Sequence, residues 1–429
     1  MSSKESVEYL KENLNIRAFL IFFRNFGLTL LLITPIFAYV GISSLREISL
    51  SNDKYPFTFW NGKDPKTEIV IVWETVENES SAVWLGKSSD NLNLIYDGDA
   101  GGVQLHRVEL SGLEPGTQYY YRVGVASTPP NYIGNINSFK TAPNSENTEF
   151  KFALIGDSQQ IFGIGAHERI AQTVGALEDL AFVGTLGDIA QESDHQGNWN
   201  QYLMEAQAFM SGTAYAPLMG NHDGWYGEKY SENKYKKYFG FATDPIYADD
   251  KHTLFNYTFS YSNTQFIIAE IAKGDDEKLD RSRNINHDKW LNATLAASQD
   301  KTFRILMLHR QVFATDAFNT DLINRIVPIA EKYKVSMVIY GHFHHYERFL
   351  YDNVTYLLQA CGGVMPTDTG INPTTPYTKA FSMGAFYTHF AINTTHIVAR
   401  TLTPDNDLID MFALKNDNSR AVLVEGGGM

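Results

Sequence analysis

The sequence predicts three successive parts: an apolar helix that spans a membrane, an all-β sandwich, and a larger α/β domain. Three observations predict them. Residues 27–45 carry no charge, residues 46–145 contain short β-rich runs separated by turns, and residues 149–415 alternate compact apolar runs with helical periodicity. Residues 416–429 form a tail. A chain of 429 residues is long enough for more than one folded domain, which agrees with this division.

Residues 1–45 are predicted to form a cytoplasmic segment and one membrane anchor. The uncharged run of nineteen residues is close to the ~20 that cross a hydrocarbon core. Lys and Arg residues precede the run, which favours a cytoplasmic N-terminus and extracytoplasmic domains. The alternative is a signal peptide whose cleavage gives a secreted protein, because the small residues Gly41 and Ser43 lie near the end of the run. Its length favours the uncleaved anchor.

The composition limits the partners and the metal chemistry. A net charge of −14, from 49 acidic and 35 basic residues, leaves no broad basic surface, so no nucleic-acid polymer is expected as a partner. Cys361 is the single cysteine, which excludes an internal disulfide and a thiolate metal cluster. Any metal must therefore be held by histidine and oxygen ligands. Association into a homo-oligomer stays open.

The second part, residues 46–145, predicts a sandwich of about 100 residues. Its segment LSGLEPGTQYYYRVGV contains a Pro115-Gly116 turn followed by an alternating strand. This segment resembles a fibronectin type III domain. In that family a tyrosine after the turn hydrogen-bonds back across the corner, a role that the resemblance assigns to Tyr119. The β-rich runs occupy residues 67–76, 81–88 and 103–110.

In the third part, apolar strand-like runs alternate with helical segments, which predicts sheets covered by helices. The predicted strands are 152–155, 180–186, 216–219, 266–271, 303–308 and 335–340, and the clearest helices are 168–180 and 320–333. Five of the strands end directly in residues that can bind metals. These clusters are Gly156-Asp157, Gly187-Asp188, Gly220-Asn221-His222-Asp223, His309-Arg310 and Gly341-His342-Phe343-His344.

Because the carboxyl ends of strands in an open α/β sheet share one edge, we expect the five clusters to meet there. A glycine before the ligand lets the backbone turn sharply out of the strand. Singly, Asp157 is more often a turn residue and His309 a satisfied buried histidine. Together, a GNH followed by Asp and a GHxH motif, each after a strand, make chance improbable. The pattern therefore predicts a metal site.

The same residues resemble those of the calcineurin-like metallophosphoesterases and, within them, the purple acid phosphatases. EFKFALIGDSQQ and GHFHHYER are similar to that family's motifs, and residues 384–414 look like its closing strand pair. The resemblance implies a four-layer catalytic domain with two sheets between helices. It further implies that Asp188 bridges two divalent ions (Fe, Mn or Zn), that Asp157 and His344 hold the first, and that Asn221, His309 and His342 hold the second.

The activity implied by this resemblance is hydrolysis of a small phosphoester, chiefly a phosphomonoester, by a metal-bound hydroxide. His222 would act as general acid for the leaving alkoxide or contact the phosphoryl oxygen. Phosphodiesterase or pyrophosphatase/nucleotidase activity is the near alternative. A non-catalytic surface adhesion or scaffold protein is an alternative of another class. It predicts a missing ligand, and none of the six is missing.

Two positions depart from the family pattern. Gln191 stands where a purple acid phosphatase has the tyrosine whose phenolate binds Fe(III), and Gln159 stands where the wider family has a histidine. The chain should therefore not be purple, a divalent pair is favoured over Fe(III), and both glutamines are candidate neutral ligands. Arg310, His345 and His195 are further candidates for contact with the substrate phosphate.

Overall fold

The structure is a computed structural model that describes residues 55–60, 62–160, 165–224, 234–240, 256–269, 277–315, 318–364, 366, 375–417 and 420–424. The predicted anchor at residues 27–45 lies outside these ranges. Within them, no helix is long and apolar enough to cross a membrane.

The sandwich is built largely from two long strands that each serve both of its sheets. The first half of β2 pairs with β1 and the end of β3, whereas its second half pairs with β4 and the start of β3. The register shifts between Glu74 and Glu79, where one sheet passes into the other. The bounds are β1 Phe57–Phe59, β2 Ile69–Ser88, β3 Asn91–Leu110, β4 Gln118–Val125 and β5 Asn131–Lys140.

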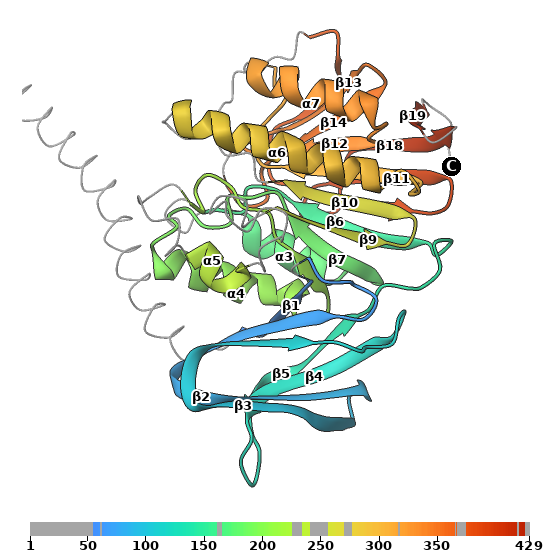
Figure 1. Ribbon diagram of the computed structural model, residues 1–429. Helices are drawn as coiled ribbons and strands as arrows, with labels where there is room; N and C mark the ends of the chain where they lie inside the picture. The colour runs from blue at the N-terminus through green and yellow to red at the C-terminus, as the bar shows by residue number, and fades with distance from the viewer. Residues whose placement is uncertain are drawn as a thin grey trace, which may run out of the picture. The chain divides into compact units, whose positions relative to one another are not determined.

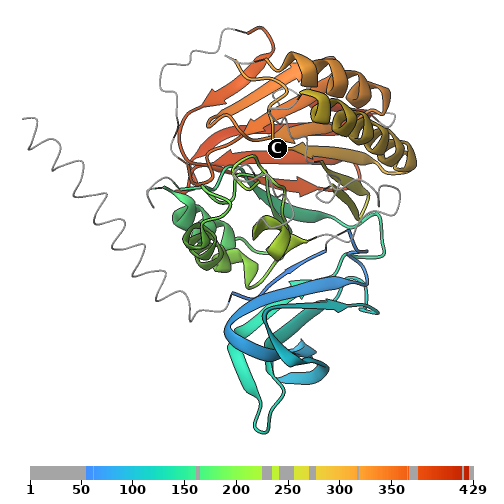
Figure 2. The ribbon, with the colours of Figure 1, turned by 60° about the vertical axis from the view of Figure 1, so that its left-hand side comes forward.

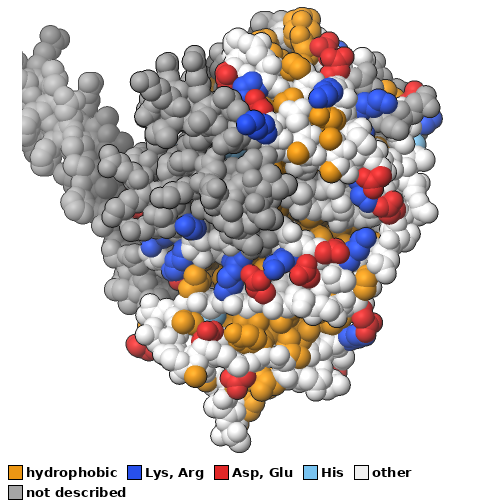
Figure 3. Space-filling model, viewed as in Figure 1, with side chains coloured by type: hydrophobic (Ala, Val, Ile, Leu, Met, Phe, Trp, Pro, Cys, Tyr) orange, Lys and Arg blue, Asp and Glu red, His pale blue; other side chains and the backbone are white. Residues whose placement is uncertain are grey.

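The predicted sandwich and its tyrosine corner are both confirmed. Alternate residues such as Ile71, Val83 and Val123 are buried in one apolar core because successive side chains of a strand point to opposite faces. The backbone N–H of Glu114 donates to the hydroxyl oxygen of Tyr119 at 2.9 Å, across the predicted turn. On the outside, apolar side chains including Leu94 stay exposed, and Figure 3 shows hydrophobic atoms over this part of the surface.

Two sheets form the centre of the α/β domain, and the larger of them continues into the strands of the sandwich. Among the described residues, one sheet has twelve strands in the order β19-β18-β17-β16-β6-β7-β8-β1-β2-β4-β5, with β3 beside β2, and the other has seven in the order β15-β13-β14-β12-β11-β10-β9. The first contains β6 Phe150–Ile155, β7 Leu180–Thr185, β8 Ala214–Ala216, β16 Tyr387–Ile392, β17 His396–Leu402, β18 Leu408–Asp417 and β19 Arg420–Val424. The second contains β9 Tyr257–Tyr261, β10 Thr264–Ala269, β11 Phe303–Leu308, β12 Met337–Tyr340, β13 Tyr346–Tyr351, β14 Val354–Gln359 and β15 Thr378–Ser382.

Helices cover the outer face of each sheet, which gives the predicted four layers (Figures 1 and 2). Rings of Phe152, Phe182 and Phe266 pack between the sheets in one continuous core. A second apolar core lies between the larger sheet and its helices, and a third lies between the smaller sheet and its helices. The helices on the larger sheet are α3 His167–Gly175, α4 Gln196–Met210 and α5 Lys234–Phe239, and those on the smaller sheet are α6 Glu277–Ala297 and α7 Thr320–Lys332.

Several predicted boundaries were wrong. The runs 67–76 and 81–88, expected as separate strands, form the single strand β2. The helix expected over 168–180 ends at Gly175, because Asp179 takes a left-handed φ of 60° and Leu180 already begins β7. The strand expected over 216–219 ends at Ala216, since Pro217 has no N–H to donate to a ladder.

The five ligand-bearing strands belong to two sheets, which corrects the expectation of a single shared edge. Parallel strands β6, β7 and β8 lie in the larger sheet, and parallel strands β11 and β12 lie in the smaller one. The loops that follow them nevertheless meet, as the contacts between their side chains show below. The site is therefore formed where the ends of two stacked sheets come together.

The sandwich and the α/β domain share backbone pairing. β1 pairs with β2 of the sandwich and, at Phe59, with Tyr215 of β8 in the α/β domain. Next to this strand, the ring of Trp60 lies 5.8 Å from that of Phe182 and 4.9 Å from that of Phe259. All described residues fall into one compact unit, so the two parts are joined by both a strand and an aromatic core.

Candidate metal centre

Sharp turns at the strand ends place the candidate ligands. Asp157, Asp188 and His342 have left-handed φ angles of 52°, 51° and 79°, which residues other than glycine adopt only in a small minority of positions. Glycines at neighbouring strand ends allow close approach to the two carboxylates. A Cβ atom on Gly341, before His342, would lie 2.3 Å from Oδ2 of Asp157, and one on Gly220, before Asn221, would lie 2.2 Å from Oδ1 of Asp188. Side chains larger than hydrogen at these glycines would displace the carboxylates.

One group of ligand atoms gathers around Asp188. Atoms of Asp188, His309 and His342 lie within 4.8 Å of one another. Nε2 of His309 lies 3.3 Å from Oδ1 of Asp188 and 2.9 Å from Oδ1 of Asn221. The structure thus brings together the four residues predicted for the second metal and its bridge.

A second group lies around Asp157. Nε2 of His344 is 3.7 Å from Oδ1 of Asp157, and the N–H of His342 donates to both oxygens of this carboxylate at 3.0 Å. Nε2 of Gln159 lies 3.4 Å from Oδ2 of Asp188. Oε1 of Gln159 and Nδ1 of His344 are buried without a hydrogen-bond partner in the described part of the chain. Buried polar atoms normally have a partner, so these two have capacity left for a ligand.

Backbone carbonyls fix the orientation of two imidazole rings. Nδ1–H of His309 donates to the carbonyl of Leu186 at 2.7 Å, and Nδ1–H of His222 donates to that of Gln191 at 2.8 Å. A carbonyl only accepts, so in the neutral ring the proton is on Nδ1 and the lone pair is on Nε2. In the neutral form that a bound cation requires, His309 would turn this lone pair toward the side of Asp188 and Asn221, so that Nε2 and the two oxygens could serve as ligands.

Burial and charge together perturb this group. Burial raises the pKa of Asp157 well above its ordinary value. Burial also opposes ionisation of Asp188, but the attraction of His309 holds the pKa of this carboxyl below its ordinary value. For His309, burial disfavours the charged form, yet Asp188 and Asp157 raise its pKa to about 9. Burial lowers the pKa of His342 to about 3 and that of His344 to about 4, so both rings are neutral at pH 7.

The donor set fits a pair of divalent ions. It consists of two buried carboxylates, a carboxamide oxygen and three imidazoles, with no sulfur. Hard oxygen and imidazole ligands suit Fe, Mn or Zn, and two adjacent cations need an anionic group between them. Asp188 is placed to be that group because His309, on one side, and Gln159, on the other, contact its two different oxygens.

The remaining predicted residues differ in where they lie. Nη1 of Arg310 is 3.4 Å from Nε2 of His342, which puts the guanidinium beside the cluster. His345 is buried, with Nε2 3.2 Å from a carboxylate oxygen of Glu347. His195 is exposed at the N-terminal end of α4. Oε1 of Gln191 is buried and has no hydrogen-bond partner among the described residues.

Asp223 was missed as a functional residue, although it completes the GNHD motif. Its carboxylate is fully buried and accepts N–H groups of Ile189 at 2.9 Å, Ala190 at 3.0 Å and Gly220 at 2.8 Å. It therefore ties the loop after β7 to the loop after β8 and fixes the distance between Asp188 and Asn221. An acid directly after the predicted ligand Asn221 and the predicted general acid His222 was the available signal in the sequence.

Comparison with known proteins gives the same picture for both domains. Residues 150–346 match the family model described as "Calcineurin-like phosphoesterase", and residues 57–141 match "Purple acid Phosphatase, N-terminal domain". Purple acid phosphatase 22 of Arabidopsis thaliana is 24% identical over 311 residues, which cover 67% of this chain and 66% of that protein.

One further relative and one solved structure are also similar to this chain. A protein of Arabidopsis thaliana named "Probable inactive purple acid phosphatase 24" is 22% identical, over 72% of this chain and 58% of its own length. The match therefore spans less than two thirds of each of these relatives. The structure of purple acid phosphatase PPD1 from yellow lupin (Lupinus luteus) superimposes with a TM-score of 0.67 at 19% identity, over 85% of this chain and 75% of that one. It supports the same two-domain fold.

Proposed function

We propose that this chain, whose residues 150–346 match the calcineurin-like phosphoesterases and whose residues 57–141 match the N-terminal domain of the purple acid phosphatases, hydrolyses small phosphomonoesters. One observation carries the proposal. Six predicted ligands from five strand ends, in two sheets, gather into one group, of which Asp157, Asp188 and His309 are buried and the other three half-buried. The six are Asp157, Asp188, Asn221, His309, His342 and His344.

In this proposal Asp157 and His344 would hold one divalent ion, Asn221, His309 and His342 would hold the other, and Asp188 would contribute to both. When bound, the two ions supply Lewis acidity toward the phosphoryl oxygens and lower the pKa of water. Arg310, beside His342, is positioned to bind a phosphoryl oxygen as a charged donor.

His222 holds the proton that the leaving group needs. Its Nδ1–H is engaged by the carbonyl of Gln191, and its backbone N–H donates to Oδ1 of Asp188 at 2.8 Å. The ring is thereby fixed next to the carboxylate of Asp188. Because its Nδ1–H is held by a carbonyl, the ring can act as an acid from Nε2 only as the imidazolium, which carries a second proton there for the departing alkoxide. Gln191 orients the ring of His222 through its backbone carbonyl. The side chain of Gln191 stands where a purple acid phosphatase has the tyrosine whose phenolate binds Fe(III), and it offers only a neutral amide oxygen. We therefore expect a pair of divalent ions and a colourless protein.

We place this activity on the extracytoplasmic side of a membrane. The support is the uncharged run at residues 27–45 with the positive residues before it. Membrane extraction and protease protection of the full chain test the placement. Release of the intact chain by high salt, or digestion of its N-terminal end from outside, would contradict it.

A substrate panel tests the proposed reaction. The protein is reconstituted with Mn²⁺, Zn²⁺ or Fe²⁺ and assayed with para-nitrophenyl phosphate, bis(para-nitrophenyl) phosphate, ATP and pyrophosphate. We expect the monoester to be hydrolysed fastest, with two metal ions per chain and no visible absorption band. A preference for the diester or for pyrophosphate would reassign the class, and no turnover with any metal would reject the enzyme.

A further inference from the structure

The two loops that carry the candidate ligands of the smaller sheet are fastened to each other. One loop follows β11 and contains His309 and Arg310, and the other joins β12 to β13 and contains His342 and His344. The N–H of Gly341 donates to the carbonyl of His309 at 2.9 Å, which joins the loops where they leave their strands. Further hydrogen bonds hold the part of the first loop that lies beyond Arg310.

The first loop is held from both ends of the second one. The N–H of Phe313 donates to the hydroxyl oxygen of Tyr340, the last residue of β12, at 3.2 Å. The N–H of Thr315 donates to Oε2 of Glu347, in β13, at 3.0 Å, and the hydroxyl of Thr315 donates to Oε1 of the same carboxylate. Tyr340 and Glu347 flank residues 341–345, so the first loop is tied to the start and to the end of the histidine-containing loop.

Glu347 is a fully buried carboxylate that joins three segments of the chain. Besides Thr315, the hydroxyl of Thr378, in β15, donates to Oε1 at 2.6 Å. Nε2–H of His345 donates to Oε2 at 3.2 Å, since a carboxylate only accepts. Burial disfavours the charged form, but the hydrogen bonds from His345, Thr315 and Thr378 hold the pKa of Glu347 below its ordinary value. A buried carboxylate with several donors fixes the segments that supply them.

The place of Arg310 depends on this arrangement. Arg310 lies five residues before Thr315, and its Nη1 is 3.4 Å from Nε2 of His342. Residues 312–314, between Arg310 and Thr315, are buried. Because packed protein interiors transmit displacements, a shift of Thr315 would move the loop that presents the guanidinium.

We propose that Glu347 is a positioning residue for phosphate binding, which acts through Thr315 to hold the guanidinium of Arg310 in place. The inference rests on the proposed function, in which Arg310 binds a phosphoryl oxygen. It also gives His345 a role that differs from the predicted contact with phosphate, since Nε2 of His345 is engaged by Glu347. Phosphate should bind less tightly when the link between Glu347 and Thr315 is broken, with the metal ligands unchanged.

Phosphate affinity and steady-state kinetics test this role. The full chain is loaded with Mn²⁺, the Kd of inorganic phosphate is measured by isothermal titration calorimetry, and KM and kcat are measured with para-nitrophenyl phosphate. Glu347→Gln should raise both Kd and KM about ten-fold and lower kcat less than about three-fold, because a binding contact is misplaced. Thr315→Val, which keeps the backbone N–H, should raise Kd and KM about three-fold, whereas Thr315→Ser, which keeps the hydroxyl, should resemble the wild type.

A double variant shows whether Glu347 acts through Arg310. Arg310→Met alone should raise the Kd of phosphate at least about ten-fold, and the addition of Glu347→Gln should raise it less than about two-fold further. Multiplicative losses would overturn the inference, and so would an unchanged Kd in both Glu347→Gln and Thr315→Val. The Thr315 variants, alone and with Arg310→Met, decide the question if Glu347→Gln does not fold.

The matched control is Thr173→Val on α3. Thr173 is half-buried like Thr315, and its hydroxyl donates to the carbonyl of Pro404 at 2.8 Å. Thr173→Val should leave Kd and KM unchanged, and a rise equal to that in Thr315→Val would overturn the positioning role. Phosphate binding by the wild type without hydrolysis of any ester would reject the proposed function, while the Kd values would still decide the role of Glu347.

Discussion

At the scale of single residues, the site depends on a few side chains held in unusual positions. Asp157 and Asp188 take left-handed backbone angles, and the glycines beside them leave room that a methyl group would fill. Such conformations cost roughly 1–3 kcal/mol each and persist only where the surroundings fix them. The hydrogen bonds to Asp223 are one such restraint, since they hold the loop that follows Asp188.

The role of His222 leads to the first prediction. His222→Gln should lower kcat about 10²- to 10⁴-fold, because general acid catalysis contributes that much. The loss should be greatest for a poor leaving group such as glycerol and smallest for para-nitrophenolate, which needs little protonation. Steady-state kinetics with both substrates measure this difference.

Metal content is the control for the same variant. His222 is not among the six ligands, so elemental analysis should still find two ions per chain. Equal losses with both leaving groups, at full metal content, would indicate that His222 contacts the phosphoryl oxygen instead of donating a proton.

At the scale of elements, the sandwich strand β4 contains two tyrosines whose hydroxyl groups differ in hydrogen bonding. The hydroxyl of Tyr119 accepts the N–H of Glu114, which closes the corner before the strand. The hydroxyl of Tyr121 is fully buried and has no hydrogen-bond partner among the described residues. Burial raises the pKa of Tyr121 above its ordinary value, which keeps the phenol neutral.

Removal of the same atom should therefore have opposite effects at these two positions. Tyr119→Phe should lower the free energy of unfolding by about 1 kcal/mol, because the N–H of Glu114 loses its partner. Tyr121→Phe should leave it unchanged or raise it by up to about 1 kcal/mol, because a buried unsatisfied hydroxyl is removed. Urea unfolding of both variants measures the sign. Destabilisation by Tyr121→Phe as large as that by Tyr119→Phe would mean that Tyr121 has a partner, such as an ordered water.

At the scale of the whole molecule, the sandwich and the α/β domain should unfold together. β1 pairs with strands of both, and Trp60 is buried against Phe182 and Phe259 of the two sheets. Figures 1 and 2 show β1 between the sandwich and the remaining strands of the larger sheet. A shared sheet and a shared core favour one cooperative transition.

Trp60→Ala should lower the free energy of unfolding by about 3–5 kcal/mol, the usual effect of deleting a buried large aromatic side chain. In urea, this variant should lose phosphatase activity and far-UV circular dichroism at different concentrations, whereas we expect the two losses to coincide in the wild type. Trp84→Ala is the control, since Trp84 is buried within the sandwich and its ring contacts Tyr132. A single coincident transition in Trp60→Ala would show that the junction does not couple the domains.

Much of the candidate site was determined by the sequence alone. The six ligands follow strands with strong apolar patterns, and motifs such as GNHD and GHFHHYER are local, so composition and spacing were sufficient. The tyrosine corner was predictable for the same reason, because Leu113, the turn and Tyr119 lie within seven consecutive residues.

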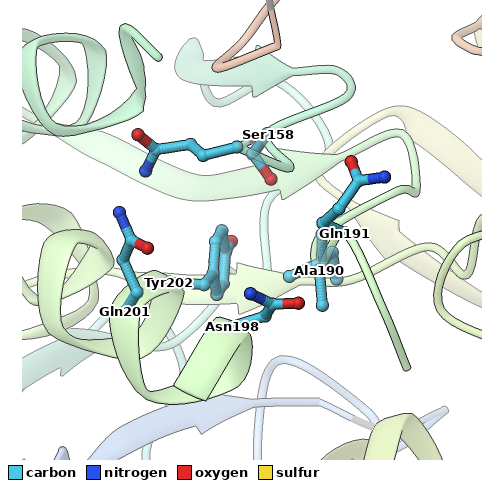
Figure 4. Close-up of a pocket in the computed structure, with 8 residues that line it drawn as sticks. Ser158, Ala190, Gln191, Asn198, Gln201 and Tyr202 are labelled. Atoms are coloured by element: carbon cyan, nitrogen blue, oxygen red, sulfur yellow. The ribbon is translucent and has the colours of Figure 1, made fainter. Parts of the chain in front are cut away.

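Only the tertiary structure decided what depends on contacts between distant segments. The five ligand strands divide between two stacked sheets, and β1 extends one sheet into the sandwich, which no local pattern specifies. Glu205 on α4 accepts the amide N–H of Gln201, and Ser158 and Gln191, from two separate loops, line the same small pocket as Gln201 (Figure 4). Contacts between segments far apart in the chain set these arrangements. The sequence therefore determined which residues can bind a metal, and the packing of sheets and helices decided what else lies beside it.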